Sequence, residues 1–332
     1  MTCLELKGVS KRYEGAAQDA VHALDLEIEE GEILGVVGAS GSGKTTLLRL
    51  VAGLEAPTTG ELRIGGLKVA GGGTWMAPEK RGVGLVFQEG ALFPHMTVEA
   101  NVAYGIRGLS KEERTARLHY LLAMVNLRAA ALRYPHELSG GERQRIALAR
   151  ALAPNPKMVL LDEPFSNLDP NLRTYLRDQL LVSIRKVKAT ALVVTHDTQD
   201  ALVISDRLAI LRDGQLVQQG PCREVYHSPN DAYCARLFGP ANALPSAWTG
   251  AVWVKGRSWI RPRELELLEK EVPGALEVQV HATQFLGDQL GILVYPIGAD
   301  RAHEEPLLVH EDMADQVHDV GATRWVRLRS MV

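Results

Sequence analysis

Short apolar runs alternate with helix-like stretches through the first two thirds of the chain. The runs ILGVV (33–37), MVLL (158–161) and ALVV (191–194) predict buried strands, and KTTLLRLVA (44–52) predicts a helix directly after the first of them. Continuous apolar strands that alternate with helices are typical of a parallel sheet covered on both faces. The pattern therefore predicts an α/β fold for this part of the chain.

A purely helical pattern interrupts this alternation near the middle of the sequence. Ser110 and Glu113 have the spacing of a capping box, which marks the start of a helix. Leucine and valine then recur at helical spacing, at Leu118, Leu121, Leu122 and Val125. We therefore expect a helical subdomain, inserted between strands, at about residues 90–155.

A hairpin is predicted near the end of the α/β region. Two strand-like segments at 208–211 and 216–219 flank the dipeptide Asp213-Gly214. Asp-Gly suits a tight two-residue turn that needs positive φ angles. The sequence therefore predicts two antiparallel strands at this point.

The pattern changes near Pro240. Short strand-like runs at 275–282 and 291–295 are separated by Gly and Pro, and the segment PANALPSAWTG (240–250) predicts a linker. We expect one domain at residues 1–240 and a small all-β, barrel-like domain at residues 241–332. Four of the five tryptophans lie in the second region, at Trp248, Trp253, Trp259 and Trp325.

Composition excludes several classes of protein. Of the 332 residues, 46% are hydrophobic and 23% are charged, so the chain is neither disordered nor fibrous. A net charge of −3 argues against a large basic face for nucleic acid. We expect no transmembrane segment, because no apolar run approaches the ~18–20 residues that span a bilayer. We also expect no signal peptide, because the N-terminal MTCLELKGVSKRY has no apolar core. Three scattered cysteines predict ordinary thiols in a reducing compartment, at Cys3, Cys222 and Cys234.

A phosphate-binding motif lies between the first strand and the first helix. Residues 38–45 read GASGSGKT, which matches G-x-x-x-x-G-K-[ST] in full. Glycines let successive N–H groups point at phosphate oxygens, and the helix N-terminus adds partial positive charge. Lys44 supplies a full charge at the β- and γ-phosphates, and the Thr45 hydroxyl can bind Mg²⁺. The predicted nucleotide-binding residues here are Gly38, Ser40, Gly41, Gly43, Lys44, Thr45 and Thr46.

Two acidic residues end the predicted strand at 158–161. Asp162 and Glu163 follow it directly, and Pro164 ends the run. Ligands bind at the carboxyl ends of strands in α/β sheets, so both carboxylates should face the phosphate site. We expect Asp162 to hold Mg²⁺ through a water and Glu163 to act as the general base for an attacking water. A polar turn without catalytic function is the alternative for this pair taken alone.

The segment 138–142 reads LSGGE and opens another predicted helix. Ser139 and Glu142 form a capping box, which accounts for a helix start without any ligand. Gly140 and Gly141 serve a cap poorly and suit close approach to phosphate. Together with the motifs above, LSGGE makes the chain resemble the ATP-binding subunits of ABC transporters over residues 1–240. The resemblance implies a P-loop NTPase sheet with a helical insertion, ATP and Mg²⁺ as cofactors, and ATP hydrolysis.

The resemblance also implies a head-to-tail dimer that encloses two ATP molecules. Ser139 and Gly141 would contact the γ-phosphate held by the opposite subunit. Residues 166–169 (SNLD) resemble the loop that crosses the dimer, with Asp169 as its nucleotide contact.

Three more residues take roles from the same resemblance. Tyr13 would stack on adenine, although an ordinary strand aromatic is the alternative. Gln88 in LVFQ would sense Mg²⁺ and water and would couple to the membrane partner, and His196 in VVTHD would reach the γ-phosphate. The implied catalytic residues are therefore Glu163, His196 and Gln88, and the implied Mg²⁺ ligands are Thr45, Gln88 and Asp162.

Two further segments resemble one group of bacterial importers. They are residues 89–107 after Gln88, and the tail motifs IRPRE (260–264) and FLGDQLGILV (285–294). The resemblance implies a peripheral subunit on the cytoplasmic face of the inner membrane, bound to a permease and acting indirectly with a solute-binding protein. Within this group, the sequence is most similar to ferric-iron importers, and the tail resembles the small TOBE-like regulatory domain of the group.

A cytosolic ABC ATPase that acts on nucleic acid or ribosomes is the alternative. Basic and aromatic residues interleave in the tail and could bind a single strand. The acidic residues that follow and the slightly negative net charge argue against it, and LSGGE argues against a P-loop kinase or GTPase. The interleaved residues are Trp253, Lys255, Arg257, Trp259, Arg261 and Arg263.

Overall fold

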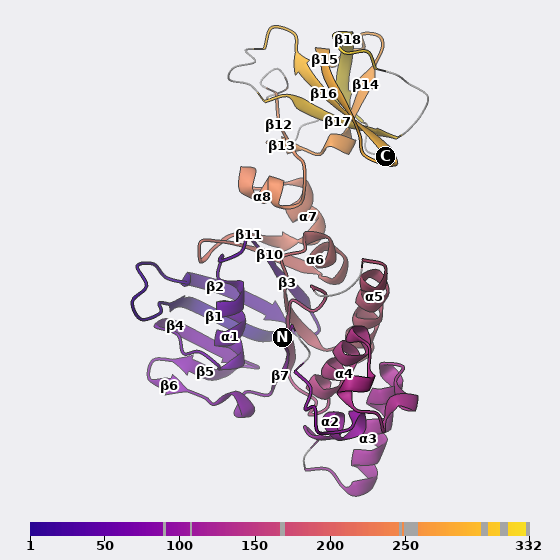
Figure 1. Ribbon diagram of the computed structural model, residues 1–332. Helices are drawn as coiled ribbons and strands as arrows, with labels where there is room; N and C mark the ends of the chain where they lie inside the picture. The colour runs from indigo at the N-terminus through magenta and orange to yellow at the C-terminus, as the bar shows by residue number, and fades with distance from the viewer. Residues whose placement is uncertain are drawn as a thin grey trace. The chain divides into compact units, whose positions relative to one another are not determined.

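The computed structural model contains two compact units, Met1–Cys222 and Arg223–Val332 (Figure 1). The described part of the chain comprises all residues except 89–90, 107, 167–169, 246–247, 249–257, 300–304, 313–317 and 330–332.

A six-stranded sheet forms the centre of the first unit. Its strand order is β11-β10-β3-β9-β8-β7, and all neighbours are parallel except β10 and β11. The three predicted buried strands are confirmed as β3, β8 and β9. The strands are β3 (Ile33–Val37), β7 (Val83–Val86), β8 (Met158–Asp162), β9 (Thr190–Val194), β10 (Arg207–Arg212) and β11 (Gln215–Pro221).

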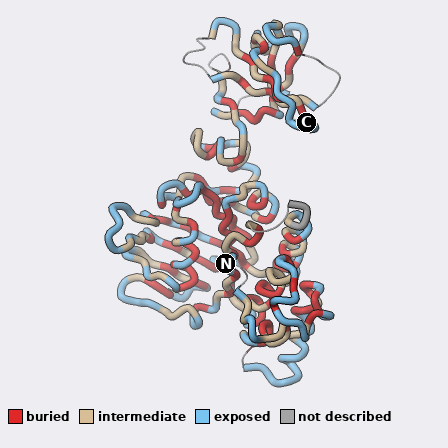
Figure 2. Tube along the Cα trace, in the orientation of Figure 1, coloured by how far each residue is buried: buried red, intermediate tan, exposed pale blue. Residues whose placement is uncertain are grey.

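Successive residues of the central strands face two different hydrophobic cores. Val159 and Leu161 lie in the core beneath the helical segment, whereas Leu160 lies in the core on the opposite face. Figure 2 shows the buried residues concentrated on these strands and the helices that flank them. Burial on both faces explains why the strands are apolar throughout rather than alternating.

The predicted hairpin is confirmed. β10 and β11 pair in antiparallel register, and the two residues between them have positive φ, 51° at Asp213 and 78° at Gly214. Positive φ at both positions is the conformation of a type I′ turn, which Asp-Gly favours.

A second sheet of the first unit is antiparallel and was not predicted. Its order is β2-β1-β4-β5-β6, and its inner face packs with helix α1 (Lys44–Ala52) in one core. The strand β2 alternates between buried and exposed positions, as a sheet with one covered face requires. The strands are β1 (Thr2–Lys11), β2 (Val21–Glu29), β4 (Thr59–Ile64), β5 (Leu67–Gly71) and β6 (Thr74–Trp75).

Helices fill the segment predicted as a helical subdomain. Ser110 caps the longest of the three α-helices there: its Oγ accepts from the Glu113 N–H at 3.2 Å, and the Glu113 carboxylate accepts from the Ser110 N–H at 2.9 Å. The predicted capping box is thereby confirmed. The helices are α2 (Val98–Ala103), α3 (Lys111–Met124) and α4 (Gly140–Leu152), followed outside the segment by α5 (Pro170–Lys186) and α6 (Thr198–Ile204).

The second unit is built on a five-stranded antiparallel sheet of order β14-β18-β15-β16-β17. The Leu267 N–H of one edge strand donates to the Glu311 carboxylate of the other at 3.2 Å, so the two edges approach as in a barrel. The predicted strands at 275–282 and 291–295 are confirmed within β15 and β16. The elements are α7 (Cys222–His227), α8 (Ala232–Leu237), β12 (Asn242–Ala243), β13 (Trp259–Ile260), β14 (Leu265–Leu268), β15 (Leu276–Phe285), β16 (Gln289–Pro296), β17 (Leu307–Asp312) and β18 (Thr323–Leu328).

The segment 240–250 is not a linker in its described part. Asn242 is buried, and its amide pairs with the backbone of Leu308 in both directions, at 2.8 Å and 2.7 Å. Trp248 is buried in the core of the second unit. The linker prediction is therefore wrong there, because an Asn side chain completes the edge of β17 as a strand would. The predicted domain boundary between residues 240 and 241 stays a prediction.

Candidate nucleotide-binding site

Glycines shape the loop between β3 and α1. A Cβ at Gly38 would lie 2.2 Å from the Leu211 carbonyl oxygen, and one at Gly43 would lie 2.3 Å from the Ala20 carbonyl oxygen. Gly43 also has a φ of 101° and offers no side-chain cap to α1. The loop therefore needs glycine at both positions, and it leaves the first turn of α1 available to an anion.

Lys44 is held inside this loop. Its ammonium donates to the carbonyl oxygens of Gly38 at 2.8 Å and Ala39 at 2.9 Å, and to the Ser42 hydroxyl at 3.4 Å. Burial lowers the pKa of Lys44, while the charges of Glu163 and Asp162 act in the opposite direction. A buried ammonium with carbonyl partners marks the place where phosphate oxygens would be most strongly attracted.

Asp162 and Glu163 face this ammonium from the end of β8. Burial raises the pKa of Asp162, and the neighbouring Glu163 charge raises it further, against the charges of Arg49 and Lys44. Glu163 has a φ of 48°, an uncommon conformation for a residue other than glycine. Strained backbone at a strand end is frequent at functional sites, so this conformation fits the role predicted for Glu163.

The structure joins two residues predicted to be catalytic. His196 Nδ1 lies 2.7 Å from the Glu163 carboxylate. The Glu163 side chain is 18% exposed and the His196 side chain 62% exposed. Glu163 is therefore shielded, while the histidine ring remains open toward solvent.

Tyr13 and Thr46, also predicted for the nucleotide, lie together at the start of α1. The Tyr13 hydroxyl lies 3.4 Å from the Thr46 hydroxyl, and the Lys11 ammonium lies 5.0 Å from the Tyr13 ring centre. Gln88 is exposed and follows β7, the neighbour of β8 in the sheet. The remaining predicted positions of the loop are exposed at its rim, at Ser40, Gly41 and Thr45.

The signature residues have local roles within the single chain. Ser139 caps α4: its Oγ accepts from the Glu142 N–H at 3.3 Å, and the Glu142 carboxylate accepts from the Ser139 N–H at 2.8 Å. Gly141 is buried, and a Cβ there would lie 2.4 Å from a Leu176 methyl carbon of α5. Ser139 remains exposed. The structure does not join it to the Lys44 loop within one chain, and Asp169 lies outside the described residues.

Sequence reasoning missed an ion-pair cluster beside His196. Arg173 on α5 binds both Asp197 and Asp200, which cap and begin α6 directly after His196. The N-cap position of Asp197 could have been found from the sequence, because Asp before a helical run is a standard start signal. The arginine could not have been found, because its pairing depends on how two helices pack.

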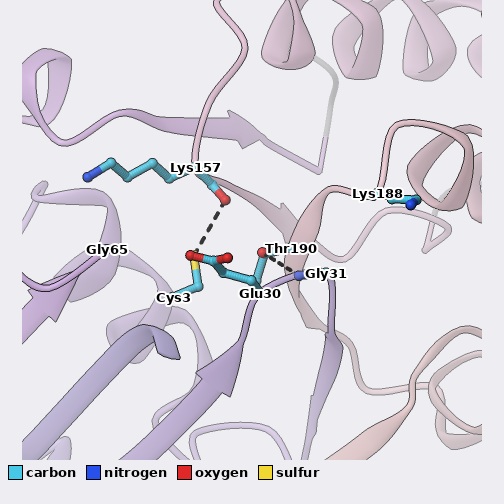
Figure 3. Close-up of a pocket in the computed structure, with 7 residues that line it drawn as sticks. All are labelled: Cys3, Glu30, Gly31, Gly65, Lys157, Lys188 and Thr190. Carbon is cyan, nitrogen blue, oxygen red and sulfur yellow. Dashed lines mark hydrogen bonds between the residues drawn. The ribbon is translucent and has the colours of Figure 1, made fainter. Parts of the chain in front are cut away.

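A cavity of about 410 Å³ lies away from this site. Its lining includes Thr190, the first residue of β9, and Lys157, which directly precedes β8, so it lies at the amino ends of these strands (Figure 3). Cys3 Sγ donates to the Lys157 carbonyl oxygen at 3.4 Å, whereas the Lys157 side chain extends away from Cys3. The cavity is therefore separate from the residues that would hold a nucleotide.

Tail residues considered for nucleic acid are engaged within the second unit. Arg261 is 5% exposed and donates to backbone carbonyl oxygens, including Ala235 O at 2.8 Å. Arg263 donates to the Gln289 side chain at 3.3 Å, and Trp259 lies beside Arg236. Arg261 therefore offers no charge to a strand of nucleic acid. Outside the described residues lie Trp253, Lys255 and Arg257.

Comparison with known proteins identifies the class. The family model described as ABC transporter matches residues 21–166. The chain belongs to the ATP-binding proteins of ABC transporters, which confirms the predicted P-loop NTPase fold and makes the chain an ATPase of this class. None of the described helices is long and apolar enough to cross a bilayer.

Two relatives and one solved structure show which members of this family the chain resembles. The chain is 36% identical to the Fe(3+) ions import ATP-binding protein FbpC of Haemophilus influenzae (strain 86-028NP), over 96% of this chain and 97% of that protein. It is 42% identical to the sulfate/thiosulfate import ATP-binding protein CysA 1 of Shewanella oneidensis, over 84% of this chain and 73% of that protein. A dimeric structure of the ATP-binding cassette MJ0796, bound to ADP and Pi, covers 66% of this chain and 99% of its own, with a TM-score of 0.56 and 34% identity.

Proposed function

We propose that this chain hydrolyses ATP to power solute import through a membrane permease, with ferric iron as the solute. The observation that carries the hydrolysis is the contact of 2.7 Å between His196 and Glu163, beside the buried Lys44 ammonium. A shielded carboxylate next to a phosphate-binding loop is the arrangement that activation of a water requires.

The loop around Lys44 would bind the phosphates, and Tyr13 would pack against adenine. The residues expected at Mg²⁺ fit that ion, because Thr45, Gln88 and Asp162 offer only hydroxyl, amide and carboxylate oxygens. The raised pKa of Asp162 also fits, since a cation would relieve the unfavourable burial of its charge. When bound, Mg²⁺ would neutralise charge on the β- and γ-phosphate oxygens.

Glu163 would take the proton from the attacking water as the water oxygen bonds to the γ-phosphorus and the bond from that phosphorus to the β–γ bridging oxygen breaks, which releases ADP and phosphate. His196 would hold the Glu163 carboxylate through Nδ1, which leaves Nε2 of the exposed ring available to the γ-phosphate. Gln88 would help to orient the water from the neighbouring strand. These three residues are the catalytic set of the proposal.

A second copy of the chain would complete the site. Ser139 is exposed at the N-terminus of α4, so its hydroxyl and the helix end are open to a γ-phosphate held by another copy. The dimeric state of the MJ0796 cassette supports this arrangement. Gly141 and Asp169 would be further contacts across the interface of the proposed dimer. The dimer would bind permease subunits as a peripheral protein on the cytoplasmic face of the inner membrane, and a solute-binding protein would act with it indirectly.

Relatives named for Fe(3+) import support ferric iron as the solute. They match 96% and 100% of this chain in Haemophilus influenzae and Pseudomonas fluorescens, so their similarity includes the second unit. The sulfate and spermidine/putrescine relatives match 84% and 82% of the chain. Other relatives named for Fe(3+) import match 74–80% of the chain, so the proposal of iron rests on the names of these relatives and not on how much of the tail they cover.

The test is a pull-down with the variant Glu163→Gln. The variant should retain Mg-ATP and stay closed as a dimer, because it keeps the binding loop and loses the base. Tagged protein is mixed with detergent-solubilised native membranes and Mg-ATP, and mass spectrometry identifies what binds. We expect multi-span permease subunits together with an iron-binding protein, and Lys44→Ala serves as the control that should not retain nucleotide.

Phosphate release measured on the same proteins tests the chemistry. Glu163→Gln should bind a fluorescent ATP analogue as the parent does, while turnover falls by at least about 100-fold. Turnover at the parent rate would remove Glu163 from its role. Recovery of ribosomes or nucleic-acid factors without a permease would favour the cytosolic alternative.

A further inference from the structure

Arg173 connects two helices beside the catalytic pair. It lies in the first turn of α5 and donates to the Asp200 carboxylate through Nε at 2.8 Å and through one terminal nitrogen at 2.6 Å. The same terminal nitrogen lies 2.8 Å from the Asp197 carboxylate. One guanidinium therefore holds two carboxylates of α6, in a charge-assisted geometry that fixes direction as well as distance.

The two carboxylates are not ordinary surface groups. The Asp200 side chain is 3% exposed, and Arg177 approaches its other oxygen at 3.4 Å. Asp197 caps α6 by accepting from the N–H groups of Gln199 at 2.9 Å and Asp200 at 3.0 Å. A buried carboxylate needs its cation, so these contacts are held together as a unit.

His196 lies within the backbone that this unit fixes. On one side Thr195 is buried, and its N–H donates to the Val36 carbonyl oxygen of β3 at 3.2 Å. On the other side the Asp197 N–H donates to the Thr195 hydroxyl at 3.0 Å. The loop that carries His196 is thus anchored to the sheet before the histidine and to Arg173 after it.

We propose that Arg173 is a positioning residue that sets His196 against Glu163 for hydrolysis. α5 begins at Pro170, shortly after Glu163 in the chain, so Arg173 ties the segment that follows Glu163 to the loop that carries His196. The inference rests on the proposed ATP hydrolysis. It assigns Arg173 no contact with nucleotide: the residue acts through Asp197, Asp200 and the backbone of His196.

A second ion pair on the same helix provides a matched control. Arg185, in the last turn of α5, binds Asp206 at 2.9 Å and 2.6 Å, and Asp206 lies just beyond the end of α6. Like Arg173, Arg185 lies on α5 and binds a carboxylate that follows β9 in the chain. It lies about 18 Å farther along the helix axis, away from His196. Asp206 is more exposed than Asp200, at 40% against 3%, so the free energy of unfolding of each variant is measured beside kcat to separate lost stability from lost positioning.

The experiment compares Arg173→Gln, Arg173→Lys and Arg185→Gln in the full chain. Phosphate release with Mg-ATP gives kcat and KM, and a fluorescent ATP analogue gives the binding stoichiometry. We expect Arg173→Gln to lower kcat about 10- to 100-fold, with KM and stoichiometry within about twofold of the parent. Arg173→Lys should recover part of kcat, because one ammonium can reach one of the two carboxylates. Arg185→Gln should keep kcat within about twofold.

A double variant tests whether the effect passes through His196. In a His196→Ala background, Arg173→Gln should cost less than about threefold more in kcat, because residues that act as a unit are not additive. The proposal is wrong if the full loss reappears in that background, or if Arg185→Gln lowers kcat as much as Arg173→Gln.

A readout independent of turnover separates this proposal from the proposed function. In ¹⁵N-histidine NMR spectra, the His196 signal is assigned by its absence in His196→Ala. Arg173→Gln should shift this signal, and Arg185→Gln should leave it in place. A parent that releases no more phosphate than Glu163→Gln would contradict ATP hydrolysis, whereas an unshifted His196 signal would contradict the positioning role alone.

Discussion

Gly141 shows how one residue can satisfy two demands at once. The sequence suggested that a glycine pair at the start of α4 serves close approach to phosphate. The structure gives Gly141 a packing reason as well, because a Cβ would lie 2.4 Å from a Leu176 methyl carbon. Gly140 is exposed at the same helix start. The proposed phosphate contact therefore depends on a position that the fold already restricts to glycine.

The thiol of Cys222 should make the stability of the first unit sensitive to alkaline pH. Burial raises its pKa to about 11, the charge of Asp206 acts in the same direction, and Sγ donates to the Ser205 carbonyl oxygen at 3.1 Å. The unfolded thiol loses its proton near pH 9, whereas the folded thiol keeps it up to about 11. The folded state therefore binds more protons in this window, and stability falls as pH rises through it.

Urea unfolding between pH 8 and 10.5 measures this effect. The parent should lose stability more steeply than Cys222→Ser, because serine does not ionise in this range. Iodoacetamide should also alkylate Cys222 in the folded protein more slowly than a free thiol at pH 8.5. Equal slopes for the two proteins would show that the thiol is not protected in this way.

At the scale of elements, the sequence correctly predicted the strands and helices that are determined by residues close together in the chain. The boundaries of β3 and α1 agree with the predictions 33–37 and 44–52, because apolar runs and the glycine loop between them are local signals. The five-stranded sheet of the first unit was not predicted: β1–β2 and β4–β5–β6 pair consecutive strands, but the β1–β4 pairing that joins them into one sheet connects distant segments. The linker at 240–250 was wrong because the Asn242 amide finds its partner in β17. The ion pairs of Arg173 were likewise out of reach, because helix packing creates them.

Asn101 should determine the shape of the loop that precedes α2. It is fully buried; its Oδ1 accepts from the Phe93 N–H at 2.8 Å, and its Nδ2 donates to the carbonyl oxygens of Phe93, Met96 and Thr97, each at 3.1 Å. Asn101→Ala should lower the free energy of unfolding by about 1–3 kcal/mol, because buried polar groups lose their partners. Proteolysis within 93–97 should become faster.

Chemical unfolding and limited proteolysis with mass spectrometry check both expectations. Gln219→Ala removes an exposed amide from β11 and should change stability by less than about 0.5 kcal/mol. Equal effects at the two positions would contradict the special role of Asn101. The loop follows Gln88, which would couple to the membrane partner, so a distorted loop should also weaken permease recovery in the pull-down.

At the scale of the whole molecule, the first unit has two hydrophobic cores and the second unit has a third. The core of the second unit contains residues from its strands together with Trp248. A single buried arginine binds backbone groups near the ends of its two short helices. Arg261 donates to Tyr226 O of α7 at 3.0 Å and to Ala235 O of α8 at 2.8 Å, and its guanidinium lies 4.3 Å from the Tyr226 ring centre. It therefore satisfies carbonyl groups that helix ends leave unpaired.

Arg261→Met should destabilise the second unit and leave the first unit intact. Methionine fills a similar volume but cannot donate, so the loss should be about 3 kcal/mol for that unit. Limited proteolysis should then cut within 223–332 while 1–222 stays protected and still binds the ATP analogue. Arg263→Met is the matched control, because Arg263 is the exposed arginine two positions away. If the control is cut as fast as Arg261→Met, the buried arginine does not hold the two helices. If 1–222 loses ATP binding in Arg261→Met, the two units are not independent in stability.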